Sequence, residues 1–285
     1  YFGDIVKELA VANDLSVKET YTQLAEMYDG YHFCEDTTGM YNPFSLLNTF
    51  DSLKFKEYWF ETGTPSFLVK MMKETSYDVT RLSGDEVGST LLTNVDSAFA
   101  NPVPFLYQAG YLTIKKREEQ QLTLDYPNRE VRDSIASMYL EYVYHVESYG
   151  ALGSDIWRGL KEHDIAKVVD LYNIALSGIP YEDYEDQGES WYRSLFLMLL
   201  RGAGVTANGE VHTNKGRPDV VAQFPGQAIV LEFKYAKDSS ELESKRLEGE
   251  QQIREKNYAK PYEAGNHEIT TAVIVIDGDK RKAVL

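Results

Sequence analysis

The chain has 285 residues, of which 43% are hydrophobic and 26% are charged, a composition typical of a globular protein with a buried core. Its length fits one large domain or two of ordinary size. The longest apolar run is 195–200, far short of the roughly 18 residues that a membrane span needs. These features exclude an integral membrane protein, and we expect neither a signal peptide nor a membrane partner.

Residues suited to redox or zinc chemistry are few. Cys34 is the single cysteine, which excludes an internal disulfide and a cysteine-rich zinc site. Five scattered histidines lack the spacing of metal ligands. Because such cysteine usage is typical of a reducing compartment, we expect a cytoplasmic location.

The net charge of −16 is unevenly distributed along the chain. Residues 1–184 hold 15 Lys and Arg against 29 Asp and Glu, a balance of −14, whereas residues 185–285 hold 14 against 16, a balance of −2. This asymmetry favours two modules. The net charge itself argues against a protein that coats nucleic acid nonspecifically.

The first half of the chain is predicted to be mostly helical. Apolar residues recur at helical spacing, and Asp14 or Ser16 is placed to cap the second helix. The predicted helices are 5–9, 17–27, 44–50 (entered through a proline), 67–72 (after a turn at 63–65) and 131–146. A charged turn at 115–120 between two β-rich runs, 111–114 and 121–124, predicts a hairpin. A winged-helix-like DNA reader, with residues 100–135 supplying helix and wing, is an alternative function of this half that its acidity disfavours.

The second half has a different pattern. Residues 148–153 are the best linker candidate, which gives modules of 1–150 and 151–285. Helices are predicted over 157–176, 189–201 and 239–256, and strands over 205–212, 218–224, 228–235 and 270–276. A three-strand meander, a crossover helix and a further strand indicate an α/β sheet with mixed strand directions, flanked by helices.

The candidate chemistry lies on two neighbouring strands. Asp219 begins one strand, and the next strand returns with Glu232 and Lys234, which alternation places on one face. Two carboxylates offer the hard oxygen ligands that Mg²⁺ prefers. A metal held in this way activates water and stabilises charge on a phosphodiester, and Lys234 would position that water or offset the charge on the phosphorane.

The same three residues also fit a simpler interpretation. An Asp and a Glu-x-Lys pair on adjacent strands can form an ordinary cross-strand ion pair on a solvated face. The pattern is short, so the match alone does not decide between the two interpretations.

Residues around this pair extend the pattern over about a hundred positions. They are Glu189-x-x-Tyr192 before the apolar run 195–200, Glu210-x-x-Thr213-x-x-Gly216-Arg217-Pro218-Asp219, Leu231-Glu232-Phe233-Lys234, and Gln252-Ile253-x-x-Lys256-x-Tyr258. In this order they resemble the PD-(D/E)xK nuclease superfamily, whose fold is restriction-endonuclease-like. The overall fold expected from this resemblance is α+β.

The resemblance implies roles for individual residues. Asp219, Glu232 and Lys234 would be the catalytic triad, and Asp219 and Glu232 would bind the metal. Glu189 would be an accessory carboxylate that contacts the metal directly or through water. Glu210 would contact metal or organise Arg217. The remaining accessory residues are Gln252 and Tyr258.

The first half is similar to the C-terminal part of an AAA-ATPase-like domain that is fused to such nucleases in bacterial, especially Bacteroides-type, proteins. The similarity rests on segments 28–33, 41–45, 58–63, 109–113 and 127–131. No G-x-x-x-x-G-K-[ST] loop is present, so we expect no ATP site in this chain.

Two functions remain open. The first is a metal-dependent nuclease, using Mg²⁺ or alternatively Mn²⁺, that cleaves nucleic acid, with DNA as the expected partner and residues 1–150 as a regulatory or docking module. The second is a catalytically silent nuclease fold that binds or assembles with a protein partner through the acidic first half. Local DNA contact would use Lys215, Arg217, Lys237, Lys245, Arg246, Arg254 and Lys256, unless the helical ones only form i,i+4 pairs. The sequence does not define the oligomeric state.

Overall fold

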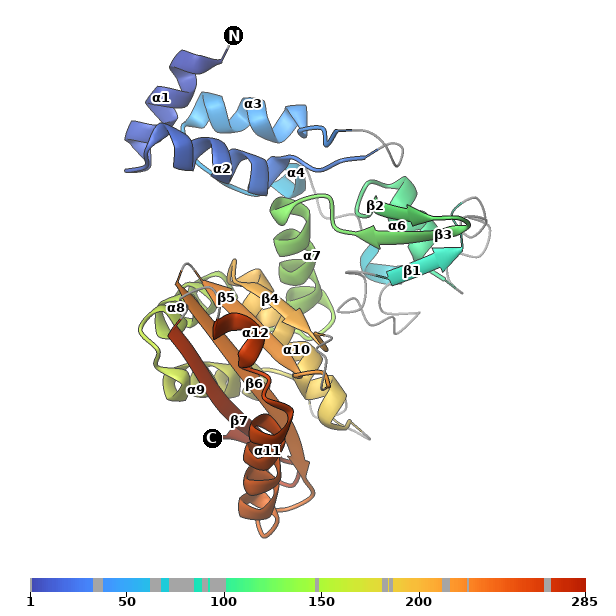
Figure 1. Cartoon of the computed structure of the whole chain (residues 1–285), viewed down its shortest axis with the longest axis vertical. Coiled ribbons are helices and arrows are strands. Elements are labelled where there is room, and N and C mark those ends of the chain that lie inside the picture. Colours follow the sequence, from blue (N-terminus) through green and yellow to red (C-terminus); the bar gives the residue numbers. More distant parts are fainter. Residues whose placement is uncertain are drawn as a thin grey trace. The chain divides into compact units, whose positions relative to one another are not determined.

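The computed structural model describes residues 2–32, 38–61, 68–71, 85–88, 92, 101–146, 149–180, 184, 187–211, 216–224, 226–263 and 268–285. The fold is a mixed α+β fold, as the sequence predicted (Figure 1). The chain divides into two compact units, Tyr1–Ile135 and Ala136–Leu285, and the division falls within helix α7 (Arg129–Tyr142). Cys34, Lys215 and the predicted turn at 63–65 lie outside the described residues.

The first unit begins with amphipathic helices. Its described helices include α1 (Gly3–Ala12), α2 (Val17–Tyr28), α3 (Pro43–Ser52), α4 (Tyr58–Glu61) and α6 (Val103–Gln108). Ser16 starts α2 with a capping box, because its hydroxyl accepts from the N–H of Glu19 while the Glu19 side chain accepts from the N–H of Ser16. Asn42 caps α3 ahead of Pro43. Leu9, Leu24, Tyr28 and Phe50 form the core between these helices.

A small antiparallel sheet follows in the same unit. Its strands are β1 (Asp85–Gly88), β2 (Thr113–Glu118) and β3 (Gln121–Asp125), in the order β1-β3-β2. The predicted hairpin is confirmed, but its turn is shorter than expected, because β2 continues to Glu118 and the chain reverses at Glu119, whose φ is 54°. The winged-helix-like arrangement remains a prediction.

A buried carboxyl group lies between α4 and α7. Glu130 is fully buried in the first turn of α7, and its Oε1 accepts a hydrogen bond from the Trp59 N–H over 3.0 Å. Burial, assisted by the charge of Glu57, raises the pKa of Glu130 to about 6. The first unit therefore holds an acidic group whose ionisation opposes folding.

The described helices that begin in the second unit, after the end of α7, are α8 (Tyr149–Lys161), α9 (Ile165–Ser177), α10 (Glu189–Gly202), α11 (Leu242–Lys256) and α12 (Lys260–Glu263). Two predictions were wrong here. Residues 149–153 are helical and do not form a linker. The single helix expected over 157–176 is interrupted because His163 adopts a φ of 58° and Asp164 starts α9 by accepting from the N–H of Lys167.

The main sheet has the predicted mixed strand directions. It consists of β4 (Thr206–Gly209), β5 (Val220–Phe224), β6 (Gln227–Ala236), β7 (Glu268–Asp277) and β8 (Lys282–Val284), in that order. The first three strands form an antiparallel meander, and α11 crosses over so that β7 runs parallel to β6. The short antiparallel strand β8 was not predicted.

Helices cover both faces of the central strand β6 (Figure 1). On one face, Phe233 packs against Phe196 of α10, with ring centroids 5.4 Å apart. On the other, Ala236 and the β7 valines pack against Leu242 and Ile253 of α11. Alternation along β6 therefore places Glu232 and Lys234 on the α11 side and Phe233 on the α10 side.

Among the described residues, no helix has the length and apolarity required to cross a membrane.

Candidate active site

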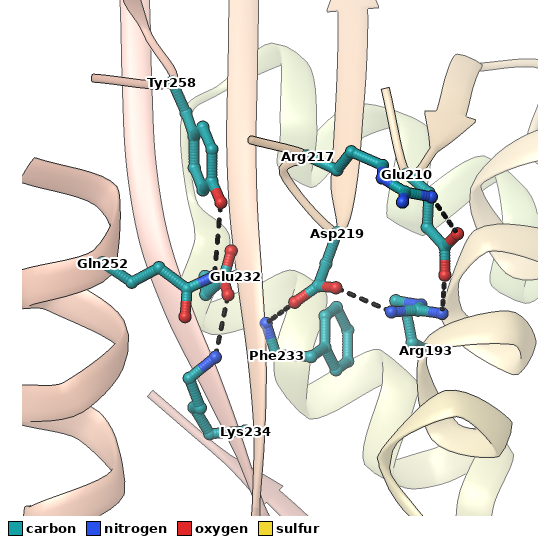
Figure 2. A network of polar contacts seen from close by, with 9 residues as sticks. All are labelled: Arg193, Glu210, Arg217, Asp219, Glu232, Phe233, Lys234, Gln252 and Tyr258. Atoms are coloured by element: carbon teal, nitrogen blue, oxygen red, sulfur yellow. Dashed lines mark hydrogen bonds and ion pairs between the residues drawn. The ribbon is translucent and has the colours of Figure 1, made fainter. Parts of the chain in front are cut away.

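Asp219 is held where β5 begins beside β6. Its Oδ2 accepts the backbone N–H of Phe233 over 2.8 Å, and its Oδ1 accepts Nη1 of Arg193 over 2.7 Å (Figure 2). The residue is 8% exposed. As predicted, the start of β5 lies beside the Glu232–Lys234 segment of β6. The hydrogen bond from the backbone of Phe233 to Asp219 connects the two.

Glu232 and Lys234 form a buried ion pair on one face of β6. The ammonium of Lys234 donates to Oε1 of Glu232 over 2.8 Å, and Lys234 and Glu232 are 7% and 1% exposed respectively. The prediction that they share a face is confirmed. The simpler interpretation as a pair on a solvated face is wrong for these two residues, because both are withdrawn from water.

Three carboxyl groups influence one another at this point. Burial, followed by the charge of Asp219, raises the pKa of Glu232, and the Lys234 ammonium opposes that shift. Burial and the charge of Asp219 also raise the pKa of Glu189, the first residue of α10. Glu189, Asp219 and Glu232 thus concentrate negative charge in a partly buried site, which is the condition that favours binding of a cation.

Arg193 is a site residue that the sequence analysis missed. Its guanidinium connects two carboxylates, Asp219 at 2.7 Å and Glu210 at 2.6 Å, while its side chain is 17% exposed. Burial lowers the pKa of Arg193, but these acidic neighbours outweigh it and the net shift is upward. The available signal was position, because Arg193 follows Glu189 by four residues and so lies one turn later on the same face of α10.

Glu210 lies just beyond β4 in an uncommon backbone conformation. Its φ is 48°, and its N–H donates to the Asp219 carbonyl over 3.1 Å, which extends the β4–β5 pairing by one residue. One role expected for Glu210 was to organise Arg217, and the ion pair between these two residues is long, at 3.8 Å. Its contact with Arg193 is much shorter, so Glu210 chiefly fixes Arg193.

The last accessory residues are on the α11 side of β6. Gln252 of α11 donates through Nε2 to the hydroxyl of Tyr258 over 3.3 Å, and Tyr258 is 2% exposed (Figure 2). Gly216 has a φ of 156°, and a Cβ there would lie 3.1 Å from the Tyr258 hydroxyl. Tyr258 therefore packs against the backbone of the segment that leads to Asp219.

The donor chemistry of this site suits a divalent cation. Oε2 of Glu232 is buried and has no hydrogen-bond partner within the described part of the chain, so a buried carboxylate oxygen is left for a further ligand. Together with Asp219 and Glu189 it supplies the hard oxygen donors that Mg²⁺ prefers. Across the described segments, however, no three His, Cys, Asp or Glu side chains are already grouped to hold a metal. Binding would therefore require side chains of the site to move.

The fold and this arrangement agree with a known class of protein. Residues 187–284 match the PD-(D/E)XK nuclease superfamily, so this part of the chain is a PD-(D/E)XK nuclease superfamily domain. Nucleases of this class usually use divalent metals and act on nucleic acid.

The chain is also similar to one curated protein over most of its length. It is 28% identical over 271 residues, 92% of the chain, to an uncharacterized protein in the vnfD 5′ region of Azotobacter chroococcum mcd 1. The chain spans about half of that relative, 51% of its length. No solved structure gives a significant match.

Proposed function

We propose that this protein hydrolyses phosphodiester bonds of DNA with Mg²⁺, with Mn²⁺ as an alternative ion. The observation that carries the proposal is the buried Glu232–Lys234 pair beside Asp219, with Oε2 of Glu232 left unpartnered within the described residues. Most buried polar side-chain atoms in proteins have a hydrogen-bond partner, so the unpartnered oxygen of Glu232 calls for an explanation. The spare oxygen is consistent with a ligand that completes the site.

The residues of the site would divide the work. Bound Mg²⁺ would activate a water molecule and offset charge on the phosphate. Asp219, Glu232 and Glu189 would hold the cation. Lys234 keeps N–H groups in addition to the one that it donates to Glu232, and these would orient the attacking water, whose oxygen bonds to phosphorus as the phosphate–sugar bond breaks.

We propose DNA as the substrate, held through its phosphate backbone by cations beside the site. Arg246 and Lys245 of α11 are poorly suited to contact a phosphate, because both are already held in short ion pairs. Arg246 pairs with Glu243 and Glu250, and Lys245 pairs with Glu248. By contrast, the Arg217 side chain is 56% exposed, and its ion pair with Glu210 is long, at 3.8 Å. The side chain of Lys256 lies beside the same segment as Arg217, because its Cδ would be 3.5 Å from a Cβ added at Gly216. Arg217 and Lys256 would therefore contact the phosphate backbone beside the cleaved bond.

Residues 1–150 are proposed as a docking or regulatory module that corresponds to the trailing part of an AAA-ATPase-like domain. Two observations support the docking role. The module carries most of the negative charge of the chain. Phe44 and Leu47, three residues apart on α3, are 45% and 55% exposed, which is consistent with contact to a protein partner.

The test is nicking of supercoiled plasmid by the purified protein in Mg²⁺, Mn²⁺ or EDTA. The variants are Asp219→Asn and Lys234→Met, and the matched controls are Asp155→Asn and Arg158→Gln, which remove the same charges from an exposed ion pair on α8. We expect metal-dependent nicking by the wild type and both controls. Both site variants should lose it by at least about 100-fold, the usual range for removing an electrostatic catalytic group.

Other outcomes would reject the proposal in different ways. Nicking that survives both site substitutions would assign the activity to another site or to a contaminant. No nicking by the wild type on plasmid or on linear and single-stranded DNA, together with no metal-induced thermal stabilisation, would favour the silent binding or assembly module.

A further inference from the structure

The contacts of Arg193 bear on how a cation would enter the site. Both oxygens of Asp219 have a donor: Oδ1 receives the Arg193 guanidinium and Oδ2 receives the Phe233 N–H. Glu232, in contrast, has one oxygen without a partner in the described residues. Each of the two carboxylates therefore pairs with an internal cation, Asp219 with Arg193 and Glu232 with Lys234, but of the two only Glu232 keeps an oxygen without a donor.

The position of Arg193 makes it a competitor for a divalent ion. A guanidinium 2.7 Å from Oδ1 of Asp219 places a full positive charge where a metal bound to the same oxygen would lie. The two cations repel each other, and water screens this little because the Arg193 side chain is only 17% exposed. Arg193 stays protonated at any accessible pH, so it can yield the oxygen only by moving.

Glu210 is a second carboxylate to which Arg193 is already bound. Nη2 of Arg193 lies 2.6 Å from Oε1 of Glu210, while Nη1 makes the contact with Asp219. The fork of the guanidinium would allow one arm to leave Asp219 while the other stays on Glu210. The displaced arginine would then remain next to the site and keep one ion pair.

We propose that Arg193 is an internal substitute for the metal: it neutralises Asp219 in the metal-free protein, a divalent cation displaces it from Oδ1, and Glu210 retains it. This inference rests on the proposed metal-dependent function. It assigns Arg193 and Glu210 as positioning residues that set metal affinity. The absence of a preformed metal-binding group among the described residues is consistent with it.

The test is isothermal titration of Mn²⁺ and Mg²⁺ into the full chain, without nucleic acid. We expect Arg193→Gln to tighten metal binding by about tenfold, which corresponds to about 1.4 kcal/mol. Arg158→Gln removes the same charge from exposed α8 and should change the Kd less than about twofold, as expected for a screened surface charge. Arg193→Lys keeps the charge but loses the fork that spans Asp219 and Glu210, so its metal affinity should lie between those of the wild type and Arg193→Gln.

A second variant keeps the test decisive should Arg193→Gln fold poorly. Glu210 is 43% exposed, and Glu210→Gln should weaken metal binding because Arg193 would then rely on Asp219 alone. In an Arg193→Gln background the same Glu210→Gln change should have little further effect. Thermal unfolding in EDTA verifies folding of every variant, and the metal-induced rise in Tm gives a second measure of affinity.

The outcomes separate the two proposals. Wild-type binding that is not tightened by Arg193→Gln, or is unaffected by Glu210→Gln, overturns the role of Arg193. An equal effect of Glu210→Gln with and without Arg193 makes Glu210 a direct ligand and overturns its role as the retaining residue. No heat from either the wild type or Arg193→Gln at millimolar metal overturns the metal-dependent function and this inference together.

Discussion

The backbone N–H of Phe233 donates to Oδ2 of Asp219 over 2.8 Å, and so connects the start of β5 to the middle of β6. Phe233 separates Glu232 from Lys234 along β6. One backbone bond therefore fixes Asp219 relative to both members of the buried ion pair. Asp219 has a neutral partner in this N–H and a charged partner in Arg193, and substitutions can distinguish the two.

Asp219→Asn should preserve the fold while abolishing cleavage. The asparagine carbonyl can still accept the Phe233 N–H, but Arg193 loses a charged partner, so the free energy of unfolding should fall by about 1–3 kcal/mol. Nicking should fall by at least about 100-fold. Urea denaturation and plasmid nicking measure the two effects. For the exposed control Asp155→Asn, a stability change above about 1 kcal/mol would contradict the argument from burial.

Lys234→Met should destabilise the protein more than any surface change of charge. It leaves Glu232, which is 1% exposed, as a buried acid without its cation, and breaking such a pair costs about 3–5 kcal/mol. The double variant Glu232→Gln/Lys234→Met removes both charges and should recover much of that loss. Urea denaturation of the single and double variants measures the coupling. Additive losses would show that the two side chains do not depend on each other.

The central part of the site could be predicted because it depends on local periodicity. Glu232 and Lys234 are two residues apart on one strand, so alternation alone places them on one face. The position of Asp219 followed from the antiparallel return of β5 to β6, which a short turn enforces. Burial of the pair did not follow from the sequence, because it depends on how α11 covers that face of the sheet.

The spacing from Glu189 places Arg193 on the same face of α10, but the contacts of Arg193 could not be predicted, for the same kind of reason. A lone arginine in the first turns of an apolar helix is ordinary in sequence, and its partners Glu210 and Asp219 come from segments later in the chain. Only packing of α10 against the sheet brings them together. Likewise, the break between α8 and α9 has no glycine or proline at 162–164, and it depends on the positive φ of His163.

The buried carboxyl of Glu130 should make stability decrease as pH rises through the acid range. Its folded pKa of about 6 lies above the ordinary value of 4.5, so the folded state holds the proton more tightly. Below about pH 4.5 the group therefore has no destabilising effect, and above about pH 6 its ionisation costs about 2 kcal/mol. From pH 4 to 7, the unfolding free energy of Glu130→Gln should therefore rise by this amount relative to that of the wild type. A difference independent of pH would contradict the prediction.

Arg217→Ala and Lys256→Ala should each weaken binding to DNA, whereas Arg246→Ala should not. All three substitutions remove one positive charge, but Arg246 is already neutralised by Glu243 and Glu250. Removing one cation that touches a phosphate should reduce the slope of log K against log salt by about 1. Fluorescence anisotropy of labelled DNA in EDTA, repeated over a range of salt concentrations, measures both the affinity and the slope. If all three substitutions weaken binding equally, the affinity for DNA depends only on the net charge of the protein and not on these positions.

Gly249→Ala should destabilise the second unit despite the higher helix propensity of alanine. A Cβ at Gly249 of α11 would lie 2.6 Å from Cγ1 of Val273 on β7, so the helix would have to move away from the sheet. Overpacking of this kind costs about 1–3 kcal/mol, against a propensity gain of at most about 1 kcal/mol.

The matched control is Gly178→Ala, where the nearest atom would lie at an ordinary 3.6 Å and no positive φ is required. It should change the free energy of unfolding by less than about 0.5 kcal/mol. Combining Gly249→Ala with Val273→Ala removes the clashing methyl groups and should recover part of the lost stability. If it does not, the loss arises within α11 itself, and contact with β7 is not the reason for glycine at position 249.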